Sequence, residues 1–169
     1  MTTHRLVLLR HAKAEHGLSL PDRDRPLALR GRRQSAQVGT DLVAAGVVPD
    51  LVLCSSALRT RQTWDLLHAT LHADPELIVS DDLYDAGVDD VLDAVRTVDE
   101  ATGTVLVVGH EPVMSATAAA LAGLGSDEAT YARVRAGVPT GAWTLLTPTG
   151  SWSQLARGGA RLVRMVVPA

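Results

Sequence analysis

The sequence predicts an α/β fold, a three-layer sandwich in which a mostly parallel central sheet is flanked by helices on both faces. Two observations support this prediction: strand-like and helix-like segments alternate along the chain, and the strand-like segments are continuous apolar runs. Strands of a parallel sheet have this composition because helices cover both of its faces. No repeat, low-complexity tract or linker interrupts the 169 residues, so we expect a single domain over residues 1–169.

The order of the elements follows from these patterns. Strands are expected at residues 6–9, 50–54, 76–80, 104–109, 142–147 and 160–167. Helices are expected at about 28–45, 57–72 and 88–100, and from Pro112 to about residue 124. Gly46 is a suitable stop for the first helix, and Ser55 or Ser56 is a suitable cap for the second. Only a turn separates the last two strands, so we expect one antiparallel pairing at an edge of the sheet.

Composition excludes several functional classes. The net charge of -3 and the pI near 6.0 provide no overall basic field, and no basic stripe carries interleaved aromatic residues, so nucleic acid is not an expected partner. No apolar run has the length of a membrane span, and the short N-terminal run is interrupted by Arg10, so we expect neither a membrane association nor a signal peptide. The single cysteine, Cys54, suits a small core position and a reducing compartment, which favours a cytoplasmic location.

Three of the predicted strands end in residues of related chemistry. Arg10 and His11 follow the first strand, Ser55, Ser56 and then Arg59 follow the second, and His110 follows the strand at 104–109. Ligands of open α/β sheets bind beyond the carboxyl ends of the strands, where helix N-termini also favour anions. Guanidinium groups at this edge would suit a compact anion with several oxygens, and phosphate is the obvious candidate.

The two histidines fit chemistry on such a phosphate. A neutral imidazole at His11 could attack phosphorus, because nearby arginines would keep its pKa low. His110 could donate a hydrogen bond to an equatorial oxygen as charge develops. No metal or cofactor is needed if arginine and histidine supply the positive charge. A histidine–metal site is the alternative, since His68 and His72 have a helical ligand spacing, but Arg59 and Arg61 of the same helix would repel a cation.

These motifs also resemble a known family. The segment "LVLLRHAKAE" resembles the Arg-His signature of the histidine phosphatase superfamily, in its phosphoglycerate mutase-like branch, and "RHAKAE" looks most like the small SixA-type phosphohistidine phosphatases. The segments "DRDRPLALRGRRQS", "CSSALRTRQTW", "VLVVGHEPVM" and "RLVRMVVP" resemble further parts of that family, in the right order. The resemblance covers most of the chain, and it implies a phosphoglycerate mutase-like fold.

Carried over by position, the resemblance implies that His11 is the phosphorylated nucleophile, that Arg10 and Arg59 hold the phosphoryl oxygens, and that His110 completes the pocket. Arg59 is preferred to Arg61 because it precedes Gln62 and Thr63 at the family spacing. Ser56 is expected either to add a hydroxyl to the phosphate site or only to cap the helix.

The chain departs from the family pattern at some positions. Ala12 stands where the signature commonly has glycine, and Glu111 follows the second histidine, where a carboxylate should weaken anion binding unless it points away. The family often has an acidic residue that protonates the leaving group. The candidates here are Asp85 and Asp89, of which Asp85 is preferred as the acid; a loop carboxylate or a helix cap is the alternative for it.

The expected function is that of a metal-independent phosphatase with a phosphohistidine intermediate, acting on a phosphorylated substrate such as a phosphohistidine-carrying protein. A short chain without a large inserted lid suits a protein-borne phosphate, with the loop from Leu18 to Arg25 and the "LYDAG" loop at the entrance. A small-molecule phosphomonoesterase or mutase, and a non-catalytic phosphate-binding module, are the alternatives. The sequence assigns no oligomeric state and no role to Lys13 or Glu15.

Overall fold

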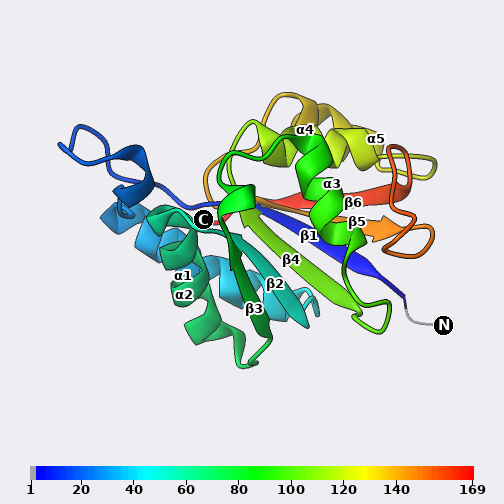
Figure 1. Cartoon of the computed structure of the whole chain (residues 1–169), viewed down its shortest axis with the longest axis horizontal. Coiled ribbons are helices and arrows are strands. Elements are labelled where there is room, and N and C mark those ends of the chain that lie inside the picture. Colours follow the sequence, from blue (N-terminus) through cyan, green and yellow to red (C-terminus); the bar gives the residue numbers. More distant parts are fainter. Residues whose placement is uncertain (1–2) are drawn as a thin grey trace.

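One mixed β-sheet runs through the structure, a computed structural model that describes residues 3–169 (Figure 1). Met1 and Thr2, which the single-domain prediction includes, lie outside the described residues. The strand order is β3-β2-β4-β1-β5-β6. The strands are β1 (Arg5–Arg10), β2 (Leu51–Ser55), β3 (Glu76–Ser80), β4 (Thr104–Gly109), β5 (Trp143–Pro148) and β6 (Ala160–Val166).

Helices cover both faces of this sheet, as the sequence predicts. In Figure 1, α1 (Leu29–Ala44) and α2 (Leu58–Leu71) lie on one face, and α3 (Val88–Arg96), α4 (Val113–Leu121) and α5 (Glu128–Arg135) lie on the other. Two short 3₁₀ helices, η1 (Asp22–Asp24) and η2 (Asp81–Leu83), interrupt the loops. Among residues 3–169, no helix is long and apolar enough to cross a membrane.

The core is divided by the sheet into two apolar clusters, and each central strand contributes alternate residues to them. In β1, Leu6 and Leu8 belong to the cluster under α3, α4 and α5, whereas Val7 and Leu9 belong to the cluster under α1 and α2. The same alternation holds along β2 and β4. Side chains of a strand point to opposite faces in turn, so a strand that is covered on both sides is apolar at every position.

The register of the strands brings the carboxyl ends of β1, β2 and β4 to one edge. Arg10, the last residue of β1, pairs with Gly109 of β4, and Cys54 of β2 pairs with Val108 of β4, both in parallel. The residues that follow these three strands therefore begin side by side. This edge of the sheet is where the predicted phosphate site must form.

Some features of the fold differ from the expectation. Strand β5 pairs antiparallel with β1 as well as with β6, so the sheet has two antiparallel pairings rather than one. The sequence pattern does not predict α5, which buries only Thr130 and Val134. Ala57 is the N-cap residue of α2 and makes no side-chain cap bond, so the expected capping by Ser55 or Ser56 is wrong.

Candidate active site

His11 follows β1 directly, and its imidazole is held in one orientation. The ring is buried, with 8% of its surface exposed, and Nδ1 lies 2.7 Å from the carbonyl oxygen of Ala12. A carbonyl oxygen only accepts hydrogen bonds, so Nδ1 must carry the proton and donate it. The second nitrogen, Nε2, then keeps its lone pair, which is the state that a nucleophile requires.

The two helices beside β1 fix the backbone that carries His11. The amide of Ala12 donates to Oγ1 of Thr63 on α2, at 3.0 Å. The amide of Lys13 donates to Oε1 of Gln34 on α1, also at 3.0 Å. Gly31 lets α1 approach this closely, because a Cβ at that position would lie 2.0 Å from the carbonyl oxygen of Lys13. The loop after β1 is therefore anchored on both sides.

Arg59 enters the site from the first turn of α2, and its guanidinium is almost fully buried. Its Nη1 donates to the carbonyl oxygen of Asp22 at 2.8 Å, and its Nη2 donates to the Asp22 carboxylate at 3.1 Å. The same Nη2 lies 3.3 Å from Nδ1 of His110. Arg61 is exposed and donates to the carbonyl oxygen of Ser56 at 3.0 Å. The structure thus places Arg59, and not Arg61, beside the histidines.

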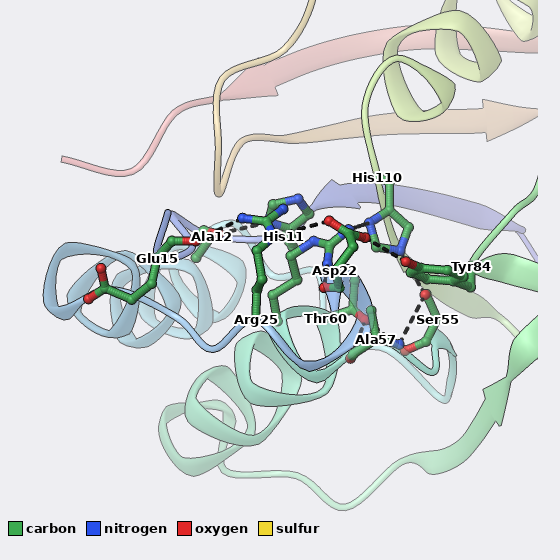
Figure 2. A network of polar contacts seen from close by, with 11 residues as sticks. His11, Ala12, Glu15, Asp22, Arg25, Ser55, Ala57, Thr60, Tyr84 and His110 are labelled. Carbon is green, nitrogen blue, oxygen red and sulfur yellow. Dashed lines mark hydrogen bonds and ion pairs between the residues drawn. The ribbon is translucent and has the colours of Figure 1, made fainter. Parts of the chain in front are cut away.

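His110 follows β4 and is held by two neighbours. Since a guanidinium can only donate, Nδ1 of His110 accepts from Arg59, and Nε2 must then carry the proton. Nε2 donates to the hydroxyl of Ser55 at 2.7 Å. The ring centroids of His11 and His110 are 5.5 Å apart (Figure 2). In the structure, His110 is therefore a hydrogen-bond acceptor toward the arginine, and not yet the donor that the sequence predicts.

Arg10 supplies a second guanidinium from the end of β1. Its Nη1 donates to the carbonyl oxygen of Val138 at 2.9 Å. Glu111 supports this contact, because its carboxylate accepts from the amide of Val138 at 3.0 Å and from the amide of Ser115 at 2.8 Å. Both oxygens of Glu111 are thus occupied by backbone amides. This arrangement reduces the repulsion of an anion that the sequence analysis anticipates.

These groups line one small cavity with a positive wall. Its volume is about 210 Å³. The Nε atoms of Arg10 and Arg59 are buried and have no hydrogen-bond partner within residues 3–169. Buried donors are nearly always paired in proteins, so two such donors beside one cavity indicate a site for an acceptor with several oxygens. The lining consists of Arg10, His11, Lys13, Ala14, His16, Arg25, Arg59, His110, Glu111 and Thr140.

Burial and positive charge keep both imidazoles neutral. Burial lowers the pKa of His11 from 6.5 to about 3, against the opposing effect of the hydrogen bond to Ala12, and His110, Arg59 and Arg10 add to the lowering. Burial and then Arg59 lower the pKa of His110 to about 4. Burial also lowers the pKa of the Arg10 guanidinium. At neutral pH the cavity therefore combines uncharged imidazoles at His11 and His110 with the cationic side chains of its lining, Arg10 and Arg59 among them.

The outer wall of the site forms around the carboxylate of Asp22 (Figure 2). Besides Arg59, it accepts from the hydroxyl of Tyr84 at 2.5 Å and from Nε of Arg25 at 3.0 Å. These bonds, that of Tyr84 foremost, hold the pKa of Asp22 well below its usual range. The ring of Tyr84 in turn meets His110 edge-on, with centroids 5.6 Å apart. The loop of Leu18 to Arg25 and the "LYDAG" loop therefore meet above the histidines.

Two of the predicted site residues lie outside the cavity lining. The hydroxyl of Ser56 contacts Arg23, and Arg23 also contacts the carboxylate of Asp81. Asp85 is exposed and lines an adjoining cavity of about 200 Å³, which it shares with His110. The other candidate acid, Asp89, pairs with Arg157 at 3.0 Å.

Sequence reasoning missed the contacts of Ser55 and Asp22. Strand alternation indicates the correct serine, since Ser55 points to the same face of β2 as Leu51 and Leu53, the face that α4 covers. Asp22 has no local signal of this kind. Its carboxylate reaches Arg59 only because the loop after β1 folds back over α2.

The fold and this site define an α/β protein that brings two guanidinium groups and two neutral imidazoles together in one small cavity at the edge of its sheet. The model of the histidine phosphatase superfamily (branch 1) matches residues 6–91. An uncharacterized protein of Mycobacterium tuberculosis strain H37Rv is 38% identical over 161 residues, which cover 95% of this chain and 99% of the relative. The chain belongs to the histidine phosphatase superfamily, and it is a phosphatase of the SixA-type branch.

Solved structures agree with this assignment. A protein assigned as phosphohistidine phosphatase SixA from Nakamurella multipartitia is 35% identical and has a TM-score of 0.87, with 100% of this chain and 98% of that chain covered. Its counterpart from Agrobacterium tumefaciens is 27% identical, with a TM-score of 0.81 and 99% of each chain covered. The tungstate complex of the protein histidine phosphatase SixA, at 22% identity and a TM-score of 0.78, shares the fold. The predicted phosphoglycerate mutase-like fold is confirmed.

Proposed function

We propose that the chain is a metal-independent phosphatase that forms a phosphohistidine intermediate on His11 and that its substrate is a phosphohistidine-carrying protein. One observation carries the proposal: the hydrogen bond from Nδ1 of His11 to Ala12 leaves Nε2 unprotonated beside two guanidinium groups with unused donors. A nucleophile and an anion site are thus combined in one small cavity.

In the first step, the lone pair of His11 Nε2 attacks phosphorus in line with the substrate P–N bond, which breaks. The substrate imidazole leaves as a neutral group when its other nitrogen carries a proton, so this reaction does not depend on a strong acid. His11 then bears a positive charge, because Nδ1 keeps its proton, and the carbonyl oxygen of Ala12 stabilises that charge. Asp85, which is exposed beside His110, stays the candidate acid for phosphate esters.

In the second step, water attacks the phosphorus of phospho-His11 and the P–N bond to Nε2 breaks. The water protons stay on the inorganic phosphate or pass to solvent, and His11 returns to its neutral form. Arg10 and Arg59 hold the equatorial oxygens in both steps. The phosphoryl dianion raises the pKa of His110, and the imidazole can then take a proton on Nδ1 and donate to an oxygen.

The size of the site supports a protein-borne phosphate. A cavity of about 210 Å³ holds a phosphoryl group but is smaller than the usual pocket for an enclosed small molecule. The rim consists of exposed side chains of the two loops. Two SixA-type proteins with solved structures are described as phosphohistidine phosphatases, which agrees with this substrate class.

The experiment is a substrate panel for the wild-type chain, His11→Ala and the control His68→Ala, which changes a half-buried position of α2 outside the cavity lining. The panel contains a phosphohistidine peptide, phosphoserine and phosphotyrosine peptides and a sugar phosphate, with free phosphate as the readout. We expect the highest kcat/KM for the phosphohistidine peptide and a loss of at least about a thousandfold in His11→Ala only. An unchanged rate in His11→Ala would contradict the proposed nucleophile, and a transfer without free phosphate would indicate a mutase.

A further inference from the structure

A larger cavity lies beside the edge strand β3, and we call it the β3 groove. Its volume is about 640 Å³. Leu53 and Ile78 of the sheet contribute apolar surface, Asp82 and Asp85 lie on one side, and Asp90 and Asp93 of α3 lie on the other. This groove is not part of the His11 cavity. It does, however, share Leu83 and Asp85 with the smaller cavity that includes His110.

Strand β3 is an unusually exposed edge. It pairs with β2 alone, and the side chains of Leu77, Ile78 and Val79 are 41%, 44% and 45% exposed. The amide of Glu76 and the carbonyl of Ser80 bond toward β2. Because backbone groups alternate in direction along a strand, those of Leu77 and Val79 point outward, away from β2. A free apolar edge of this kind is a template for an added strand.

The negative charge beside β3 indicates which kind of segment could add to this edge. Five aspartates line the groove, at positions 81, 82, 85, 90 and 93, and its lining contains no basic residue. Arg23 and Arg96 pair with Asp81 and Asp93, whereas the carboxylate of Asp82 has no partner among the described residues. A second copy of the chain would bring aspartates against aspartates. Charge complementarity therefore favours a basic segment of a different protein.

The short helix η2 connects the β3 groove with the rim of the His11 cavity. This short helix ends at Leu83, and the next residue, Tyr84, contacts both Asp22 and the ring of His110. A segment that lies along β3 would thus end close to the rim of the His11 cavity. The same chain could then present its phosphorylated side chain to His11.

We propose that the β3 groove docks a basic and apolar segment of the phosphoprotein substrate as an added strand on β3. This inference rests on the proposed function. The backbone of the segment bonds to the outward groups of Leu77 and Val79. Its alternate side chains are lysines or arginines, whose aliphatic stems cover Ile78 and whose charged ends face Asp82 and Asp93. The groove thereby selects proteins by the residues that accompany the phosphohistidine.

The test uses two synthetic phosphohistidine peptides, one flanked by alternating lysine and valine and the other by alternating glutamate and valine. The variants are Asp82→Lys with Asp93→Lys, and Val79→Pro, which removes one outward amide. The matched control is Asp65→Lys with Glu128→Lys, which makes the same change of net charge at exposed positions outside the groove. Hydrolysis of p-nitrophenyl phosphate reports the integrity of the His11 cavity.

We expect the wild-type chain to prefer the lysine peptide by about tenfold, mainly through KM, and the preference to weaken with salt. The groove variant should lose this preference and keep its activity on p-nitrophenyl phosphate, and Val79→Pro should raise the KM of both peptides. Equal kcat/KM for the two wild-type reactions would overturn the docking inference. An equal loss of the preference in the control variant would also overturn it. So would a wild-type dimer that Val79→Pro dissociates, because a second copy of the chain would then occupy β3.

A binding measurement separates the two proposals. Fluorescence anisotropy of the unphosphorylated lysine–valine peptide needs no catalysis. If neither phosphohistidine peptide is hydrolysed while p-nitrophenyl phosphate is, the proposed substrate class fails. Binding of the lysine–valine peptide that is lost in the groove variant would still support the groove, and binding that is equal in both proteins would overturn it.

Discussion

The inner and outer parts of the site are held by different forces. Arg10, His11, Arg59 and His110 come from the ends of two central strands and from the first turn of α2, and their positions follow from the packed sheet. The outer part depends on contacts of loop side chains around one carboxylate, that of Asp22, which is itself exposed. The inner groups have buried backbones on rigid elements, whereas the outer groups lie on loops.

This difference suggests a division of roles. In the proposed function, the inner part supplies a fixed nucleophile and fixed positive charge, which phosphoryl transfer requires for any substrate. Contacts between exposed charges are worth little individually, so the outer part can change with the partner without loss of the fold. Changes in the inner part should therefore affect turnover on every substrate, and changes in the outer part should affect binding.

Among changes to the two parts of the site, we expect the largest loss of catalytic activity for Arg59→Lys. Lysine keeps the charge but loses the planar fork that matches phosphate oxygens, so kcat/KM should fall by about a hundredfold or more on every substrate. Arg61→Lys is the matched control, since Arg61 lies two residues further along α2 and is exposed. Steady-state kinetics of both variants measure the effect. Equal losses in the two variants would place the phosphate contact elsewhere.

The next effect is on the pH dependence of the free energy of unfolding. Both imidazoles have pKa values below 6.5 in the folded chain, at about 3 for His11 and about 4 for His110. The unfolded chain thus binds more protons below pH ~6.5, and the free energy of unfolding falls as the pH falls toward ~4, by up to ~1.4 kcal/mol per pH unit for each imidazole. Denaturant unfolding at several pH values measures this slope. His11→Gln should make it shallower, and an unchanged slope would contradict a buried neutral His11.

A smaller effect is expected for Ser55→Ala. The variant removes the hydroxyl that accepts from Nε2 of His110 and leaves the ring free to turn. We expect a loss of about tenfold in kcat/KM, the value of one ordinary hydrogen bond. Ser56→Ala is the control, because that hydroxyl contacts Arg23. A larger loss in Ser56→Ala would reverse the roles that the structure gives the two serines.

The smallest effect is expected for Asp22→Asn, at the outer part of the site. The Asp22 carboxylate opposes an anion bound to Arg59, so its neutralisation should lower the inhibition constant of inorganic phosphate. We expect a change of about threefold, because the Asp22 carboxylate is exposed to solvent, which weakens its repulsion of the anion. Tyr84→Phe removes one bond to Asp22 but keeps the charge, and it should leave that constant nearly unchanged. Weaker inhibition in Asp22→Asn would show that Asp22 serves mainly to hold Arg59 in place.

The sequence was informative wherever burial imposed a simple pattern. The interiors of β1, β2 and β4 are apolar because both faces of these strands are covered, and the ends of the strands direct attention to Arg10, His11, Arg59 and His110. The site prediction thus depends on local patterns and on one general property of parallel sheets.

The features of the fold and of the site that the sequence does not predict depend on contacts that no local pattern encodes. The antiparallel position of β5 beside β1 is a pairing between residues far apart in the chain. The contact of Asp22 with Arg59 spans a loop and a helix, and the choice between Ser55 and Ser56 depends on the register of one strand. Helix α5 buries few residues, so its sequence lacks a clear apolar stripe.

The central claim is that Nε2 of His11 forms the covalent intermediate. Rapid quenching of the wild-type chain with a phosphohistidine peptide into alkali, where phosphohistidine persists, allows the modified residue to be identified by peptide mass spectrometry and its nitrogen by ³¹P and ¹⁵N NMR. We predict one phosphoryl group on Nε2 of His11, because Nδ1 is occupied by its bond to Ala12. A phosphoryl group on Nδ1 of His11, on His110 or on no residue of the chain would contradict the account.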